Sequence, residues 1–316
     1  MKKGPVTPKG FRDIDPDTAK KRRRIINTIA ETLERYGFVP IETPTIEFAD
    51  TLLGKYGEDE KLIYQFTDRG NRNLALRYDL TVPLARYVAN NLGVIEKGPF
   101  RRYQIGQVFR GENPQAGRYR EFTQFDFDTV GLGSSEEDAR VVVAAIKACD
   151  AIGLHDSVML INDRRVFVKL KEQGLANDAE LPLVLRALDK LEKIGANGFL
   201  VELEQSNIPK DRAQAVLDNI QLLKNALTQS EYMANIVDSA RKERINARRV
   251  ALFPQLARGL DYYTSTIFEL RQSERPGELS IGGGGRYDHL IGMFAGKGIP
   301  AVGFSFGVDR LVQCCP

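Results

Sequence analysis

The longest stretch of helical periodicity lies near the start of the chain, between residues 16 and 35. Its apolar positions recur three and four residues apart, which places them on one face of a helix. Asp15 and Pro16 form a start signal, because proline is favoured at the first helical position. The pattern predicts a helix from Pro16 to about Arg35, with an apolar face made of Ile25, Ile26, Ile29, Ala30 and Leu33.

Residues 100–131 carry the clearest strand pattern. Residues 101–109 have strand-like content, and a charged turn with glycine and proline follows at residues 111–117. In the second strand Gln124, Asp126 and Asp128 fall on one face and largely apolar residues on the other. The pattern predicts an antiparallel hairpin with a polar tip. Its polar face is a candidate pocket floor, although a strand at the molecular surface would show the same alternation.

Shorter patterns predict the other elements. A strand at residues 37–47 is interrupted by Pro40 and Pro44, which suits a sheet edge or an interface. Four glycines at residues 282–285 lie between strand-like segments and would let backbone approach a ligand closely. Ser134 and Glu137 form a capping box for a helix that ends before Gly153. A helix is expected to begin near residues 79–83, and a strand followed by a helix is expected in residues 298–312. Further strands are expected at residues 64–66, 74–77, 158–162, 250–253 and 257–270.

The character of the sequence changes between residues 164 and 246. Leucine, lysine, glutamate, alanine and glutamine dominate there, glycine is sparse, and helical spacing prevails. We interpret this segment as a helical module inserted between sheet strands. The chain is therefore predicted to be α/β (α+β), with a catalytic-type domain in two parts, residues 1–163 and 247–316, around the module at 164–246.

Composition narrows the possible partners and the compartment. The net charge of the 316 residues is only +3, so any nucleic-acid binding must use local patches. The basic run at residues 20–24 is the candidate for such a patch, although a solvated helix face is the favoured interpretation. The three cysteines match neither a disulfide framework nor zinc spacing, and no metal site made of protein side chains is expected. Without a long apolar run or a signal peptide, the chain is expected to be cytoplasmic, with no membrane partner.

Arginines around the hairpin tip are the strongest chemical signal. Arg110, Arg118 and Arg120 form a donor set suited to phosphate, because guanidinium groups bind phosphate bidentately. The sequence contains no GxxxxGK[ST] phosphate loop, and no dinucleotide-binding glycine fingerprint follows a strand. A bound nucleotide would therefore rest on arginine side chains.

The stretch FRRYQIGQVFRGENPQAGRYREFTQFDFDTVG (residues 100–131) resembles motif 2 of the class II aminoacyl-tRNA synthetases in its histidyl form. Four further segments agree: LRYDLTVPLAR, ARGLDYYTSTIFEL, GGGGRYDHLIGMF and GIPAVGFSFGVDRLV, of which the last resembles motif 3. Residues 37–47 resemble part of motif 1, which forms the dimer interface. The resemblance implies an antiparallel sheet flanked by helices and a homodimer. It also implies a histidine–tRNA ligase, which activates L-histidine with ATP and Mg²⁺ and transfers it to the 3′ end of tRNA(His).

The resemblance assigns roles around ATP. Arg110 corresponds to the arginine at the α-phosphate, and Glu112 to a residue near adenine. Arg118 corresponds to a residue near the γ-phosphate, and Arg310 to the motif 3 arginine beside adenine and the distal phosphates. Arg258 would approach both the α-phosphate and the amino-acid carboxylate. Arg110, Arg258 and Arg310 are thus the candidate catalytic residues, and no side-chain base for the transfer step is identifiable.

For histidine, the resemblance implies that the segment Asp79, Leu80 and Thr81, together with Gln124 and Arg258, surrounds the ammonium and carboxylate. Asp128 and Tyr263 would bracket the imidazole, and Tyr262 and Tyr287 would line the pocket. At the motif 2 tip, Gln115, Ala116 and Gly117 would meet the tRNA acceptor end. The family's helical insertion holds the acceptor arm, although a structural or dimer-supporting bundle is an alternative. His289 stands where the family more usually has glycine and is expected to be a surface imidazole.

Histidyl synthetases normally continue into a C-terminal anticodon-binding domain, and this sequence stops soon after motif 3. The resemblance therefore implies a catalytic core that activates histidine but charges tRNA poorly. The alternative is the synthetase-like regulatory subunit of ATP phosphoribosyltransferase, which shares the fold. A dimeric scaffold without activity is a third reading. The presence of Arg110, Glu112, Arg118, Arg258 and Arg310 favours the enzyme.

Overall fold

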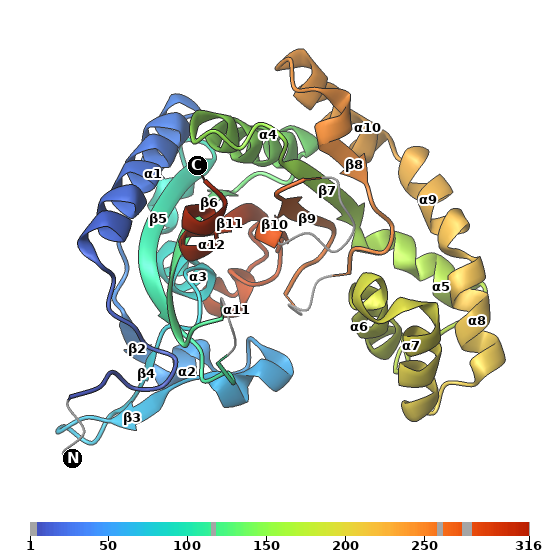
Figure 1. Ribbon diagram of the computed structural model, residues 1–316, viewed down its shortest axis with the longest axis horizontal. Coiled ribbons are helices and arrows are strands. Elements are labelled where there is room, and N and C mark those ends of the chain that lie inside the picture. The colour runs from blue at the N-terminus through green and yellow to red at the C-terminus, as the bar shows by residue number, and fades with distance from the viewer. Residues whose placement is uncertain (1–4, 115–117, 258–261, 274–279, 316) are drawn as a thin grey trace.

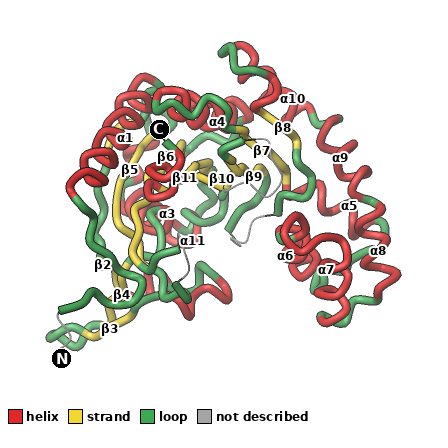
Figure 2. Tube along the Cα trace, viewed as in Figure 1, coloured by secondary structure: helices red, strands yellow, loops and turns green. Residues whose placement is uncertain are grey.

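The computed structural model of this chain describes residues 5–114, 118–257, 262–273 and 280–315. A curved sheet forms the centre of the molecule, long helices cover its outer face, and a group of helices extends to one side (Figure 1). Helices, drawn in red, lie on both sides of the strands, drawn in yellow (Figure 2). None of the helices in these described ranges combines the length and the apolar character needed to cross a bilayer.

The central sheet has eight strands in the order β1-β5-β6-β11-β10-β9-β7-β8. All neighbouring pairs are antiparallel except the two outermost, β1 with β5 and β7 with β8. This confirms the predicted antiparallel sheet flanked by helices. The strands are β1 (Val39–Pro40), β5 (Phe100–Phe109), β6 (Glu121–Val130), β7 (Val158–Asp163), β8 (Val250–Leu252), β9 (Thr266–Arg271), β10 (Ser280–Arg286) and β11 (Ala301–Gly307).

A second, three-stranded sheet changes one prediction. Strand β4 (Asn73–Leu76) lies between β2 (Ile46–Phe48) and β3 (Gln65–Thr67). Residues 37–47, predicted as one interrupted strand, are instead divided between β1 at the edge of the large sheet and β2 in the small one. Pro40 and Pro44 explain the division, because neither can donate a ladder hydrogen bond.

The predicted start signals of two helices on the outer face had different outcomes. Helix α1 spans Pro16–Arg35, as predicted, and the side chain of Asp15 accepts from the amides of Asp17 and Thr18, both at 3.0 Å. Helix α4 spans Ser135–Ala151, but the predicted capping box is wrong. The side chain of Ser134 makes no cap hydrogen bond, and the carboxylate of Glu137 instead accepts from Arg101 Nε at 3.0 Å.

The opposite side of the sheet carries shorter helices. These are α2 (Ala49–Leu52), α3 (Thr81–Asn90) and α11 (Gly292–Ala295), with single turns at Gly57–Leu62 and Leu92–Ile95. They share an apolar cluster that includes Tyr78, Val82 and Tyr287.

The last helix, α12 (Val308–Cys314), follows β11 directly, as predicted for residues 298–312.

Residues 164–246 are largely helical. They contain a turn at Arg164–Phe167 and helices α5 (Val168–Glu172), α6 (Leu181–Asp189), α7 (Leu191–Gln205), α8 (Lys210–Asp218), α9 (Ile220–Thr228) and α10 (Glu231–Lys242). The earlier helices bury a core of their own around Phe199. Helix α10 differs, because Met233, Ile236 and Ala240 belong to the apolar core beneath the central sheet. A short turn at Ala247–Arg249 then leads into β8.

The strand predicted at residues 257–270 is shorter than expected. Strand β9 begins only at Thr266, Tyr262 precedes it outside any strand, and residues 258–261 lie outside the described part of the chain. The glycine run forms the interior of β10, between β9 and β11. A Cβ atom on Gly284 would lie 2.0 Å from the carbonyl oxygen of Gly303, so no larger residue fits there without movement of the backbone.

Candidate functional site

A cavity of about 540 Å³ opens on the face of the sheet formed by β6, β11 and β10. Most residues predicted to bind substrate line it. They are Asp79, Thr81, Arg110, Glu112, Arg118, Gln124, Asp128, Tyr262, Tyr263, Tyr287 and Arg310. Leu80 does not line the cavity: its side chain is fully buried and its carbonyl accepts from Arg102 Nη2 at 3.3 Å. Arg258 and the predicted acceptor-end residues Gln115, Ala116 and Gly117 lie outside the described residues.

Strand β6 supplies the floor of the cavity through simple alternation. Phe125 and Phe127 point into the apolar core shared with α1 and α4. Gln124, Asp126 and Asp128 therefore point the opposite way and line the cavity. The prediction that this polar face forms a pocket floor is thus confirmed in its geometry.

Asp128 is held by two partners. The hydroxyl of Tyr287 donates to Asp128 Oδ1, and Arg102 Nη2 lies 2.7 Å from Asp128 Oδ2. Burial raises the pKa of the Asp128 carboxyl, while Arg102 and the hydrogen bond from Tyr287 act in the opposite direction. Sequence reasoning gave Arg102 no role. The register of the hairpin, which sets Arg102 directly opposite Asp128, is the signal that would have found it.

Asp79 lies at the start of helix α3. Its Oδ1 atom accepts from the amides of Thr81 and Val82, at 3.1 and 3.0 Å, and from the hydroxyl of Tyr56 at 3.0 Å. Its Oδ2 atom is buried and makes no hydrogen bond within the described residues. Burial raises the pKa of Asp79, opposed by these hydrogen bonds and by Arg110. One oxygen therefore caps the helix, while the other is buried without a hydrogen bond within the described residues.

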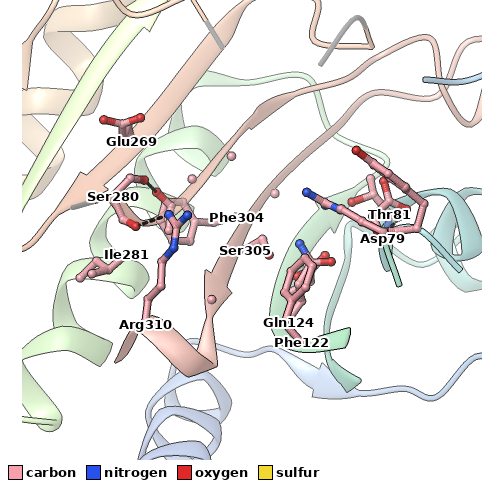
Figure 3. Close-up of a pocket in the computed structure, with 18 of the residues that line it drawn as sticks. Asp79, Thr81, Phe122, Gln124, Glu269, Ser280, Ile281, Phe304, Ser305 and Arg310 are labelled. Carbon is pink, nitrogen blue, oxygen red and sulfur yellow. Dashed lines mark hydrogen bonds between the residues drawn. The ribbon is translucent and has the colours of Figure 1, made fainter. Parts of the chain in front are cut away.

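The arginines occupy the walls. The guanidinium of Arg110 lies 4.3 Å from the ring centroid of Tyr78, and its Nε donates to the Tyr78 carbonyl at 3.2 Å. Arg310 Nη1 donates to the carbonyl of Ser280 at 2.6 Å. Arg118 forms an ion pair with Glu112. Arg310 and Ser280 lie at one end of the pocket with Glu269, and Asp79 and Thr81 lie at the other (Figure 3).

Asp309, the residue before Arg310, anchors a network that sequence reasoning missed. Its Oδ1 accepts from both Arg12 and Arg22, and its Oδ2 accepts from the amide of Thr123 at 3.0 Å. The guanidinium of Arg12 also stacks 3.6 Å from the ring centroid of Tyr119. These contacts tie the N-terminal segment and α1 to motif 3 and to the hairpin.

Three members of the basic run at residues 20–24 have partners in the protein. Arg22 binds Asp309, Lys21 Nζ donates to the carbonyl of Cys315 at 2.6 Å, and Lys20 Nζ lies 3.4 Å from Asp17 Oδ1 on the exposed face of α1. Across the described ranges no three His, Cys, Asp or Glu side chains gather as a metal ion would require. His289 is exposed.

The comparisons with known proteins agree with this geometry. The model of a family described as histidyl-tRNA synthetase matches residues 10–311. A histidine–tRNA ligase of Aeropyrum pernix is 42% identical over 98% of this chain and 74% of its own length. A crystal structure of histidyl-tRNA synthetase from Nostoc superposes with a TM-score of 0.82 at 30% identity, covering 99% of this chain and 75% of that one.

A third relative bears on the alternative function. Its crystal structure is titled an ATP phosphoribosyltransferase regulatory subunit/histidyl-tRNA synthetase from Bacillus halodurans. It superposes with a TM-score of 0.79 at 25% identity, over 98% of this chain and 83% of that one.

An antiparallel sheet flanked by helices, with an arginine-walled pocket over the motif 2 hairpin, defines a class II aminoacyl-tRNA synthetase fold. Within that class, the chain belongs to the histidyl-tRNA synthetase family.

Proposed function

We propose that this protein is a histidine–tRNA ligase. It activates L-histidine with ATP to histidyl-adenylate and transfers the histidyl group to the 3′ end of tRNA(His). The proposal is supported most directly by the lining of one cavity, which combines carboxylates and phenols with arginines. The first group suits a small cationic amino acid and the second suits a polyphosphate.

Histidine would lie at the end of the cavity formed by Asp79, Thr81 and the floor strand. Its imidazole has two polar nitrogens that need partners once the ring is buried. Asp128 and Tyr263 are the proposed partners, with Tyr262 and Tyr287 completing the wall. An apolar amino acid of similar size would leave this carboxylate and phenol without ligand hydrogen bonds, which a buried polar site strongly disfavours.

ATP would extend toward Arg310 and Ser280. The attacking carboxylate and the α-phosphate are both anionic, so the site must neutralise charge while it aligns them. Arg110 is proposed to contact the α-phosphate, and Arg118 and Arg310 the distal phosphates. Arg110 is stacked against Tyr78, so its guanidinium is already oriented before ATP binds.

Mg²⁺ is proposed to arrive with ATP, where it would neutralise the distal phosphates. Glu269 is a carboxylate that lines the same end of the cavity as Arg310. Glu112 lines the cavity as well and is paired with Arg118. The donor chemistry fits a hard cation held chiefly by phosphate oxygens, with these carboxylates beside it.

Histidine-dependent exchange of pyrophosphate into ATP tests the activation step. We expect exchange with L-histidine and not with leucine or glutamine, and its loss in Arg110→Ala. Arg23→Ala is the matched control, because Arg23 is exposed on α1 and lies outside the cavity. An absence of exchange in the unmodified protein would contradict the proposal.

The Bacillus halodurans relative motivates the alternative, a regulatory subunit of ATP phosphoribosyltransferase. Such a subunit would bind histidine without forming the adenylate. Histidine binding by calorimetry, combined with undetectable exchange, would favour this alternative over the ligase.

The remaining parts of the proposal concern partners and location. We propose that residues 115–117 and the helical module contact the tRNA acceptor end, and that the protein acts in the cytoplasm. We also propose a homodimer formed through the small sheet and the neighbouring edge strand. Its support is a set of exposed apolar side chains there, Val39, Ile46, Phe48 and Phe66, of which Phe48 is 57% exposed.

A further inference from the structure

Strand β6 places a carboxylate on the cavity floor that neither the resemblance nor the assigned chemistry uses. Asp126 lies between Gln124 and Asp128 on the same face of the strand, is only 3% exposed and lines the cavity. Its cross-strand neighbours are Gln104 on β5 and Ser305 on β11. Its Oδ1 atom makes no hydrogen bond within the described residues. A buried carboxylate with an unpartnered oxygen facing a cavity is unfavourable unless a ligand completes it.

Three other residues that line the cavity also carry a buried oxygen with no hydrogen bond within the described part of the chain. These oxygens are Asp79 Oδ2, Gln124 Oε1 and Asp128 Oδ2, of which the last forms an ion pair with Arg102. Asp79, Gln124 and Ser305 lie around one region of the pocket (Figure 3). An ammonium group carries three N–H donors and no acceptor, so the three oxygen atoms Asp126 Oδ1, Asp79 Oδ2 and Gln124 Oε1, which receive no hydrogen bond in the described residues, match it.

We propose that Asp126 binds the α-ammonium group of the amino-acid substrate, and that with Asp79 and Gln124 it completes a three-acceptor site for that group. The proposal rests on the proposed function and adds a specificity-determining residue to it. Asp128 is assigned to the imidazole instead, because its carboxylate differs from that of Asp126 in being bound by the hydroxyl of Tyr287 and ion-paired with Arg102. The floor strand thus separates two tasks, ammonium recognition at Asp126 and ring recognition at Asp128.

The charges around Asp126 come from each element that packs against it. Arg102 on β5 and Arg77, which follows β4, are the buried cations that face it, and Asp79 and Asp128 are the carboxylates. Burial raises the pKa of Asp126 to about 7, with Asp128 and Asp79 adding to the rise and Arg102 and Ser305 opposing it. An arriving ammonium favours the ionised carboxylate. Substrate binding at or below about pH 7 therefore expels a proton from Asp126.

The test separates the ammonium from the ring by choice of ligand. Histidine and histidinol carry the ammonium and the imidazole, whereas imidazole-4-propionate carries the imidazole and carboxylate without the ammonium. Asp126→Asn keeps the side-chain shape and removes the charge. Because a hydrogen bond to a charged group contributes about 1.5–3 kcal/mol, we expect about 10- to 100-fold weaker binding of histidine and histidinol. Binding of imidazole-4-propionate should change by about twofold or less.

Asp128→Asn is the matched control on the same strand face, two residues away. It should weaken all three ligands, because all three contain the ring. If Asp126→Asn also weakens all three equally, or weakens none, Asp126 has no role in ammonium recognition and the proposal is overturned.

Wild-type protein supplies an independent measurement that requires no variant. Calorimetry near pH 7 in two buffers with different ionisation enthalpies gives the number of protons released on binding. Histidinol should release more protons than imidazole-4-propionate, and equal release would overturn the proposal. Binding of these ligands does not depend on catalysis. A protein that fails in pyrophosphate exchange but shows this difference would therefore refute the ligase and retain the ammonium site.

Discussion

The ion pair between Arg102 and Asp128 allows a quantitative prediction about stability. The Arg102 side chain has no exposed area, the Asp128 side chain is 4% exposed, and the charged atoms are 2.7 Å apart. Replacement of Arg102 by methionine keeps most of the buried volume but leaves the Asp128 charge without its cation. Removing one partner of a buried pair typically lowers the free energy of unfolding by about 3–5 kcal/mol. We expect about 3 kcal/mol here, near the lower end of that range, because the hydroxyl of Tyr287 still donates to Asp128.

Urea denaturation of four proteins measures this effect as a double-mutant cycle. The proteins are the wild type, Arg102→Met, Asp128→Asn and the double variant. Since the amide carries no charge, Arg102→Met should destabilise the wild-type protein far more than it destabilises the Asp128→Asn variant, by about 2 kcal/mol or more. Arg23→Met on exposed α1 is the control and should change stability by about 0.5 kcal/mol or less.

The pH dependence gives the same prediction a second readout. In Arg102→Met the folded-state pKa of Asp128 rises further above its unfolded value of about 4. The folded protein then holds a proton that the unfolded chain has lost, so the free energy of unfolding falls as pH rises through this window. The deficit relative to wild type should therefore be small in acid and full at neutral pH. An additive cycle, or a deficit independent of pH, would refute the reasoning.

Four other outcomes are expected. Burial raises the pKa of Asp126 to about 7. The stabilisation that Asp126 contributes should therefore fall as pH rises from about 4 to about 7. In urea denaturation at several pH values, Asp126→Asn should remove this pH dependence. Arg258→Ala should reduce pyrophosphate exchange by about 10²–10³ while histidine binding persists, and near-normal exchange would exclude this residue from the mechanism. Asp309→Asn should raise KM for ATP more than KM for histidine in exchange assays, because Asp309 fixes the start of the helix that carries Arg310; equal increases would indicate general unfolding. Phe48→Glu should shift sedimentation toward the monomer, and an unchanged profile would place the interface elsewhere.

Local signals in the sequence predicted the parts of the fold that depend on neighbouring residues. Helix α1 begins at Pro16 and ends at Arg35 as expected, because its cap, its proline and its apolar face all lie within the helix or beside it. The motif 2 hairpin was predicted for the same reason. Its alternation also identified the cavity floor, since strand geometry alone sends Gln124 and Asp128 to the same side.

Contacts between residues far apart in the sequence could not be predicted from local patterns. Arg22 and Asp309 are 287 residues apart, and no local pattern distinguishes their bond from a solvated charge. The capping box at Ser134 failed because Glu137, in helix α4, forms an ion pair with Arg101 on strand β5. Asp126 was correctly placed on the polar face but received no role, because an unpartnered buried oxygen becomes evident only once its surroundings are packed.

The packing of α10 has a practical consequence for anyone who wishes to shorten this protein. The hydroxyl of Tyr232 in α10 donates to the buried carboxylate of Asp138, which also binds Arg286 Nη2 at 2.6 Å. Excision of residues 164–246 as a single block would remove that donor and uncover the apolar surface of α4. A deletion that stops before α10 and rejoins the chain there would leave this surface covered. The natural position for an engineered junction is therefore the loop between α9 and α10.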